Sequence, residues 1–337
     1  TGVAVAMLAA AAVLGGGADA PARACTRIFW NDNDQARVVA RTMDLFRPDE
    51  ARLQVSPRGV SRSSAAPAGP AAQWTAKYGA LVVTAFGVAV SEGLNEKGLS
   101  ASLLYLSGSQ YEPRDGRPGL PNGVWVQYVV DNFATVAEAL EGLKGVQVVA
   151  AEVAGRAWPL HLALADRSGD SAVIEYVDGR MVVHHGRQYT VMTNEPPLDW
   201  QLQNLKRYRT FGGDLAMPGD IDPASRFVRA ASYLTMLPKP AATVDALAGA
   251  MALTRNVAVP PGARDTSGQE DITDLWPTLW ISLSDTTHDV FYFAPVRGPE
   301  VIWADLNRLD FRPGAPQKSV DAYDPTLSGD ITARLLP

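Results

Sequence analysis

The stretch Cys25-Thr26-Arg27-Ile28-Phe29-Trp30 gathers β-branched and aromatic residues in a short run, which predicts a β-strand. It is followed by the turn-forming run Asn31-Asp32-Asn33-Asp34. A second strand is predicted over residues 36–44, and it ends in Arg41-Thr42-Met43-Asp44. A hairpin of this kind would bring its far end back alongside Cys25. The hairpin therefore predicts a cluster of a thiol, a guanidinium and a carboxylate.

The chemistry of this cluster depends on which groups meet. A guanidinium from Arg41 near the sulfur would lower the pKa of the thiol and stabilise the thiolate. A carboxylate from Asp44 could orient an amine at the start of the strand. The alternative is a surface ion pair between Arg41 and Asp44, usually worth under about 1 kcal/mol. Composition alone favours that alternative.

The residues before Cys25 have the pattern of a secretory signal. An almost entirely apolar run spans 3–14, Gly15-Gly16-Gly17 interrupts it, and Ala22-Arg23-Ala24 offers the small residues that a signal peptidase accepts. The run is too short to cross a bilayer as a helix, which takes roughly 20 apolar residues. We expect residues 1–24 to be removed and the protein to be exported to the periplasm or secreted.

Cys25 is the only cysteine of the chain, so it cannot form an internal disulfide. Removal of residues 1–24 would leave an α-amine and a thiol on the same residue. An amine with a pKa of about 7.7–8.0 can act as general base for that thiol near neutral pH. Two other interpretations stay open, a buried cysteine without a role and a lipid-anchored one. Arg23 and the polar residues after the apolar run argue against the anchor.

Composition narrows the class of protein. The 337 residues are 47% hydrophobic and 20% charged, which is typical of a globular chain that can bury a large core. The net charge of −6 argues against a nucleic-acid partner, and no later segment is long and apolar enough to span a membrane. The four histidines have no metal-ligand spacing, and the mature chain carries no nucleotide-binding motif. We expect one domain over 25–337 that needs no metal or cofactor.

The chain resembles the choloylglycine hydrolase and penicillin V acylase group of N-terminal-nucleophile hydrolases. The similarity starts with the hairpin and continues in family order through four further blocks. These are Leu94-Asn95-Glu96-Lys97-Gly98-Leu99, Met192-Thr193-Asn194-Glu195-Pro196, Pro218-Gly219-Asp220 and Ser225-Arg226-Phe227-Val228-Arg229-Ala230. It thins towards the C-terminus, where Asn256-Val257-Ala258-Val259-Pro260 and Val290-Phe291-Tyr292-Phe293 still match.

The resemblance implies a role for each matching residue. Cys25 would attack the amide carbonyl, flanked by Arg41 and Asp44. Asn194 would help to hold the oxyanion, and the second oxyanion position falls on Tyr105. The further active-site arginine matches Arg226, with Arg229 as the alternative register. The implied reaction passes through a thioester on Cys25, with its α-amine as the proton carrier.

The resemblance also implies an α+β fold, an αββα sandwich of two antiparallel sheets with helices on both outer faces. The sequence agrees with this fold in outline. Strands are predicted over 81–86, 160–165, 172–176, 280–283 and 290–293, and helices over 122–133, 135–143, 225–236 and 243–252. In the pair His184-His185 the two side chains should point to opposite faces of a strand.

The expected substrate is a small-molecule amide. Penicillin V acylases carry Tyr where this chain has Tyr105, whereas bile-salt hydrolases usually carry Asn. That residue favours a penicillin V-type amide or an N-acyl homoserine lactone, with a conjugated bile salt as the alternative. Trp30 and Phe46 are candidate pocket aromatics, although core packing suits them equally. The stretch between Asn194 and Arg226 is shorter than in Gram-positive members, so their tetramer is not expected, and the oligomeric state stays open, a homo-oligomer included.

Overall fold

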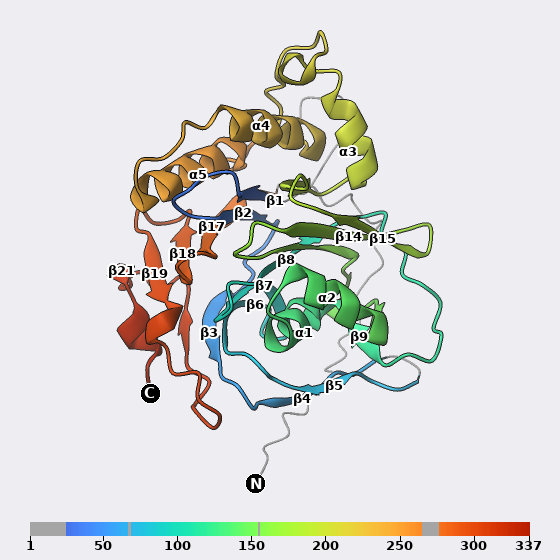
Figure 1. Cartoon of the computed structure of the whole chain (residues 1–337), viewed down its shortest axis with the longest axis vertical. Helices are drawn as coiled ribbons and strands as arrows, with labels where there is room; N and C mark the ends of the chain where they lie inside the picture. The colour runs from blue at the N-terminus through green and yellow to red at the C-terminus, as the bar shows by residue number, and fades with distance from the viewer. Residues whose placement is uncertain (1–24, 67–68, 154–155, 265–275) are drawn as a thin grey trace.

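The computed structural model describes residues 25–66, 69–153, 156–264 and 276–337 (Figure 1). The predicted signal segment 1–24 lies outside the described residues. Within them, two large β-sheets face each other and helices cover both outer faces (Figure 1). The predicted αββα sandwich is therefore confirmed.

The first sheet contains the hairpin that carries Cys25. Its strands are, in spatial order, β16 (Val191–Thr193), β1 (Thr26–Trp30), β2 (Val38–Asp44), β17 (Thr278–Asp285), β18 (Val290–Pro295), β19 (Ile302–Asp305) and β21 (Gly329–Asp330). All neighbours pair antiparallel except β19 and β21, which run parallel at one edge. The expectation of a wholly antiparallel sheet is wrong at that edge alone, where the chain returns after a long C-terminal excursion.

The second sheet is antiparallel throughout. Its order is β15 (Arg180–His185), β14 (Ser171–Val177), β13 (Leu160–Ala165), β8 (Ser100–Tyr105), β7 (Ala89–Asn95), β6 (Ala80–Ala85), β3 (Arg52–Ser56) and β20 (Ser319–Asp321). Small two-stranded ribbons join β4 (Ser61–Ser63) to β5 (Gln73–Thr75), β9 (Gly119–Pro121) to β10 (Gln147–Val149), and β11 (Glu152–Val153) to β12 (Arg156–Ala157). On β15, His184 is buried and His185 is exposed, as the alternation predicts.

The helices form the outer layers. The first sheet is covered by α4 (Pro223–Met236) and α5 (Thr243–Val257), and the second by α1 (Trp125–Asn132) and α2 (Val136–Gly142) (Figure 1). The short α3 (Leu198–Leu205) packs beside α4. Single turns of 3-10 helix occur at 122–124, 143–145, 209–211, 306–308 and 332–335. No helix in the described part of the chain is long and apolar enough to cross a membrane.

The predicted elements are found within a few residues of their expected bounds. Helix α4 begins at Pro223, two residues before its predicted start at 225, because Asp222 accepts a hydrogen bond from the Ser225 N–H at 2.9 Å and Pro223 occupies the first helical position. Helix α5 runs five residues beyond its predicted end at 252, and α3 was not predicted. Its eight residues give too short a pattern for a 3.6-residue period to stand out.

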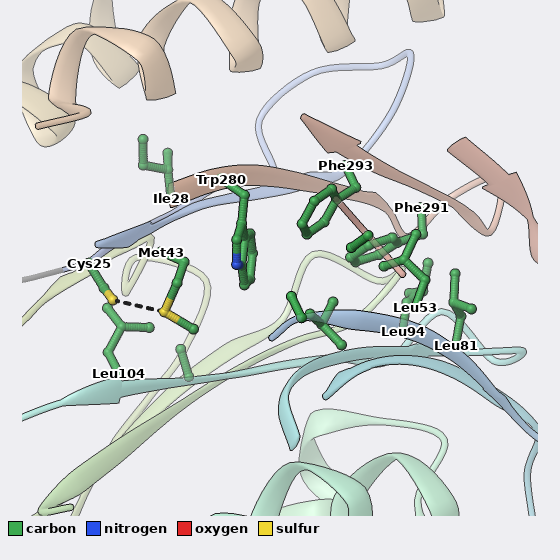
Figure 2. Packing of buried hydrophobic residues seen from close by; sticks show 14 of the residues in the cluster. Cys25, Ile28, Met43, Leu53, Leu81, Leu94, Leu104, Trp280, Phe291 and Phe293 are labelled. Carbon is green, nitrogen blue, oxygen red and sulfur yellow. Dashed lines mark hydrogen bonds between the residues drawn. The ribbon is translucent and has the colours of Figure 1, made fainter. Parts of the chain in front are cut away.

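The main core lies between the two sheets (Figure 2). Met43, Trp280, Phe291 and Phe293 project from the first sheet towards leucines of the second sheet. Along β1 the side chains alternate between this core and the helical layer. Cys25 and its sulfur lie at one end of the core, beside Met43 (Figure 2).

Candidate active site

Cys25 is buried at the start of β1, with its side chain 4% exposed. Its Sγ lies 3.9 Å from Met43 Sδ (Figure 2). It also lies 3.9 Å from the carbonyl oxygen of Asp44. The hairpin register pairs Thr26 with Thr42, so β2 returns its last residues to the level of Cys25. The predicted meeting of the two hairpin ends is thus present in the structure.

The backbone nitrogen of Cys25 is bound to Asp44. It donates to Asp44 Oδ2 at 2.8 Å, and the same oxygen accepts from the Thr42 hydroxyl at 3.2 Å. The other oxygen of Asp44 accepts from the hydroxyl of Thr278 on β17 at 2.5 Å. Both oxygens of a fully buried carboxylate are therefore used, and its position beside the Cys25 nitrogen is fixed from two sides.

Arg41 places its guanidinium beside the sulfur. Its Nη2 lies 3.5 Å from Cys25 Sγ, and its Nη1 donates to the carbonyl of Ser91 on the opposite sheet at 3.0 Å. Its Nε lies 3.5 Å from a carboxylate oxygen of Glu92, and its central carbon lies 5.0 Å from the ring of Trp280. These contacts fix the orientation of the cation towards the thiol.

The acidity of the Cys25 thiol is set by two opposing effects. Burial raises the pKa of Cys25 above its usual value, although Arg41 acts in the opposite direction. Arg41 therefore lowers the pKa of the thiol, as predicted, but burial outweighs this contribution. Removal of the thiolate from water raises the pKa by more than the adjacent guanidinium lowers it, and the nearby carboxylate of Asp44 raises the pKa further. A base that takes the thiol proton is thus needed near neutral pH.

Arg226 on α4 reaches Cys25 from the helical side. Its Nη1 donates to the Cys25 carbonyl at 2.7 Å and to the Thr26 hydroxyl, and its Nη2 donates to Asn194 Oδ1 at 3.1 Å. It also lies 3.7 Å from an oxygen of Asp44. Arg229 instead donates to loop carbonyls, those of Pro218 and Asp220, away from Cys25.

Asn194 and Tyr105 meet next to this cluster. The Asn194 amide donates from Nδ2 to the carbonyl oxygen of Tyr105 at 2.8 Å. This contact with Asn194 is made by the backbone carbonyl of Tyr105. All six residues predicted for the site, Cys25, Arg41, Asp44, Tyr105, Asn194 and Arg226, are therefore brought together from β1, β2, β8, α4 and the loop after β16.

A mostly apolar cavity opens beside the sulfur. Its lining includes Cys25, Arg41, Met43, Asp44, Leu45, Asp49, Ala85, Phe86, Ala89, Val90, Ser91, Leu103, Tyr105, Asn122, Gly123, Trp158, Leu160 and Trp276. The suggestion of Trp30 as a pocket aromatic is wrong, because β-strand alternation turns its ring towards Gly249 of α5. Phe46 packs against Trp276, which lines the cavity.

Several supporting residues were not identified from the sequence. Thr278 and Glu92 act on Asp44 and Arg41 from other strands, and Phe86, Trp158 and Trp276 form the cavity wall. Glu92 did give a signal, since it is an acidic residue in a predominantly apolar stretch before the Leu94–Leu99 block. The three aromatics lie just outside strands and carry no local pattern of their own.

Four groups meet at one apolar cavity, namely a thiol, the backbone nitrogen of the same residue, a carboxylate and an amide donor. Such an arrangement defines a site for acyl transfer. The family model of linear amide C–N hydrolases, choloylglycine hydrolase family, matches residues 25–326. The chain belongs to this family, and it is an enzyme that acts on linear amide C–N bonds.

The relatives differ in how closely they match. The chain is 37% identical to a penicillin V acylase of Pectobacterium atrosepticum over 86% of this chain and 83% of that protein. It is 26% identical to a bile salt hydrolase/transferase of Clostridium perfringens over 84% and 93% of the two chains. The structure of penicillin V acylase from Agrobacterium tumefaciens superposes with a TM-score of 0.81 at 37% identity, covering 93% of this chain and 97% of the other.

Proposed function

We propose that the mature enzyme begins at Cys25 and uses that residue as an N-terminal nucleophile. One observation carries the proposal: the nitrogen and the sulfur of Cys25 have different partners. The nitrogen is bound to Asp44, while the sulfur faces Arg41 and the cavity. After removal of residues 1–24, that nitrogen would be an α-amine held next to the thiol whose proton it takes. The family match that starts at residue 25 supports the same N-terminus.

In the first step the sulfur attacks the amide carbonyl carbon and forms a tetrahedral intermediate. The Asn194 amide has two N–H groups, one of which donates to Tyr105, so the other can bind the oxyanion. The C–N bond then breaks, the leaving amine takes a proton from the Cys25 α-ammonium, and a thioester remains. Water, deprotonated by the same amine, hydrolyses the thioester and regenerates the thiol.

The acyl side of the substrate is proposed to be an aromatic or long alkyl group. Phe86, Trp158 and Trp276 line the cavity, and an apolar cavity of this kind gains free energy from burying such a group. Penicillin V-type amides are the first candidates, because the relatives at 37% identity are penicillin V acylases. N-acyl homoserine lactones offer the same kind of amide with an alkyl chain. Export to the periplasm is part of the proposal, given the signal-like segment before Cys25.

The test is the intact mass of the secreted protein before and after iodoacetamide, with penicillin V hydrolysis measured alongside. A chain that starts at free Cys25 and loses activity on a single alkylation is expected. Cys25→Ala should be inactive, and the control Arg180→Met, at an exposed arginine on β15, should retain full activity. A lipidated Cys25, another N-terminus or activity that survives alkylation would contradict the proposal. Glycocholate and a long-chain N-acyl homoserine lactone in the same assay would rank the three substrate classes.

A further inference from the structure

Five aromatic rings form a chain of contacts around the cavity, here called the aromatic collar. Neighbouring ring centres are 4.9 Å apart for Phe46 and Trp276, 6.4 Å for Trp276 and Tyr105, 6.2 Å for Tyr105 and Trp158, and 5.6 Å for Trp158 and Phe86. Four of the five line the cavity, and Phe46 backs Trp276. Four rings of the collar therefore border the space next to Cys25.

The gap between the two ends of the collar is closed by Arg47. Its guanidinium carbon lies 4.6 Å from the ring centre of Phe86 and 6.0 Å from that of Phe46. From Tyr105, the contacts lead to Arg47 both through Trp158 and Phe86 and through Trp276 and Phe46. Arg47 thus lies across the collar from Tyr105, whose carbonyl is bound to Asn194.

The charge of Arg47 is not balanced by a carboxylate within the described residues. Its Nε is buried and has no hydrogen-bond partner there, and its guanidinium lies over the rings of Phe86 and Phe46. Asp49, the buried acid nearest in sequence, already accepts from Trp280 at 2.8 Å and from Tyr323 at 2.6 Å. By contrast, Arg58 and Arg62 each form an ion pair. This half-buried guanidinium packs on Phe86, a wall residue of the apolar cavity, and it could form an ion pair with an anionic group of a bound molecule.

The backbone under the collar is also unusual. Phe86 has a φ of 53° and is followed by Gly87 with a φ of 69°, at the tight turn between β6 and β7. Asn or Gly normally occupies the first position of such a turn, because a bulky side chain is strained there. Strain of about 1–3 kcal/mol at a pocket residue is characteristic of functional sites. Phe86 holds its ring between Trp158 and Arg47 despite this cost.

We infer that Arg47 binds a carboxylate of the substrate across the collar from the scissile amide, so that the enzyme prefers amides that carry an anionic group. The inference rests on the proposed function, since it takes the scissile bond to lie at Cys25. The carboxylate could belong to the amine part or to the acyl part of the substrate. In either case the interaction is an ion pair between the Arg47 guanidinium and a substrate carboxylate at a partly desolvated site.

Two matched pairs of substrates distinguish a carboxylate on the amine part from one on the acyl part. N-phenoxyacetyl-glycine and N-phenoxyacetyl-glycinamide differ only in a carboxylate on the amine part. The glycinamide amides of glutaric acid and of its monomethyl ester differ only in a carboxylate on the acyl part. Each is assayed with the mature wild-type enzyme, Arg47→Met, Arg47→Lys and, as a control, Arg180→Met at an exposed arginine on β15. Methionine keeps an apolar side chain against Phe86.

Arg47→Met should lower kcat/KM for the carboxylate member of one pair by about fivefold to tenfold, mainly through KM, and leave its neutral partner within about twofold. Arg47→Lys should retain part of the preference, and Arg180→Met all of it. The preference should also weaken as ionic strength rises. The pair that responds identifies the part of the substrate that Arg47 contacts.

An equal loss for charged and neutral members, or no loss in either pair, would overturn the inference. These results are distinct from a failure of the proposed function. If the proposed function were wrong, the wild-type enzyme would not hydrolyse the neutral members, or the Cys25→Ala variant would still hydrolyse them.

Discussion

Arg41 and Glu92 form an ion pair at 3.5 Å in which neither side chain is exposed to solvent. Glu92 also accepts from the Ser282 hydroxyl at 2.8 Å, and Arg27 on β1 interacts with it electrostatically. Burial raises the pKa of Glu92 to about 7 and lowers that of Arg27 to about 9. The arginine that faces the sulfur is thus backed by a glutamate whose charge changes near neutral pH.

The titration of Glu92 predicts a dependence of stability on pH. Its pKa rises from 4.5 to about 7 on folding, so the folded state binds more protons than the unfolded state between these values. Stability must then fall as pH rises through that window, by up to about 3 kcal/mol. Glu92→Gln removes this loss, so the variant should gain stability relative to wild type from pH 4.5 to 7, as measured by urea unfolding at several pH values.

An exposed acid provides the control for this measurement. Glu300→Gln should follow the wild-type pH profile, because Glu300 lies on the surface. If the stability of Glu92→Gln relative to wild type stayed constant from pH 4.5 to 7, Glu92 would not titrate as stated.

The carboxylate of Asp44 predicts a second effect, on catalysis. Thr278→Val removes the hydroxyl that donates to Asp44 and should lower kcat roughly tenfold, since a hydrogen bond to a charged group contributes about 1.5–3 kcal/mol. Thr278→Ser keeps the hydroxyl and should restore most of the activity. The valine also leaves the Val259 N–H without its acceptor, so Tm is measured alongside kcat. Equal kcat values for the two variants would show that Thr278 does not support Asp44.

A third prediction concerns the buried carboxylate of Asp49. Tyr323→Phe removes one of its two hydroxyl or indole donors, leaving the hydrogen bond from Trp280. A buried acceptor that loses a partner costs about 1–3 kcal/mol, so the free energy of unfolding should fall by that amount. Tyr292→Phe, at a partly exposed tyrosine on β18, should change it by less than about 0.5 kcal/mol. Equal effects of the two changes would mean that the contact with Asp49 is not stabilising.

The sequence allowed the hairpin part of the site to be predicted from local pattern. Strand propensity and the turn residues between the strands predict a hairpin in which Arg41 lies close to Cys25. In the observed register Arg41 pairs with Arg27. The same period of two could have excluded Trp30, because residues an odd number apart on a strand face opposite sides. The α+β sandwich and the roles of Asn194 and Arg226 came from resemblance, since those residues lie on separate elements.

The remaining parts of the site depend on the stacking of the two sheets, which no local pattern encodes. Glu92 meets Arg41 only because β7 of one sheet faces β2 of the other. The net pKa of Cys25 likewise depends on how completely the packed sheets exclude water, and the contribution of Arg41 alone does not determine it. Contacts across a core between distant segments, and the desolvation they cause, require the folded structure.

The last prediction concerns Glu175, which anchors the loop that carries Asn194. Its two carboxylate oxygens accept from the backbone N–H of Leu198 at 3.2 and 3.0 Å, at the start of α3, and one of them lies 3.1 Å from His161 Nδ1. Burial alone would raise the pKa of Glu175, but the hydrogen bonds from His161, His184 and Leu198 outweigh it and hold the pKa at about 2. The folded state thus binds this proton less readily than the unfolded state.

The stability that Glu175 contributes is therefore fully present above pH 4.5 and is lost as pH falls towards 2, by up to about 3 kcal/mol. Glu175→Gln should be less stable than wild type by a comparable amount at pH 7, and the difference should shrink below pH 4.5 in urea unfolding. Its kcat should fall as well, because the variant lacks the charged hydrogen bond between Leu198 N–H and the Glu175 carboxylate that fixes the loop carrying Asn194. A stability difference that stays constant from pH 7 to pH 3 would contradict the assignment, and an unchanged kcat would mean that the loop keeps Asn194 in place without Glu175.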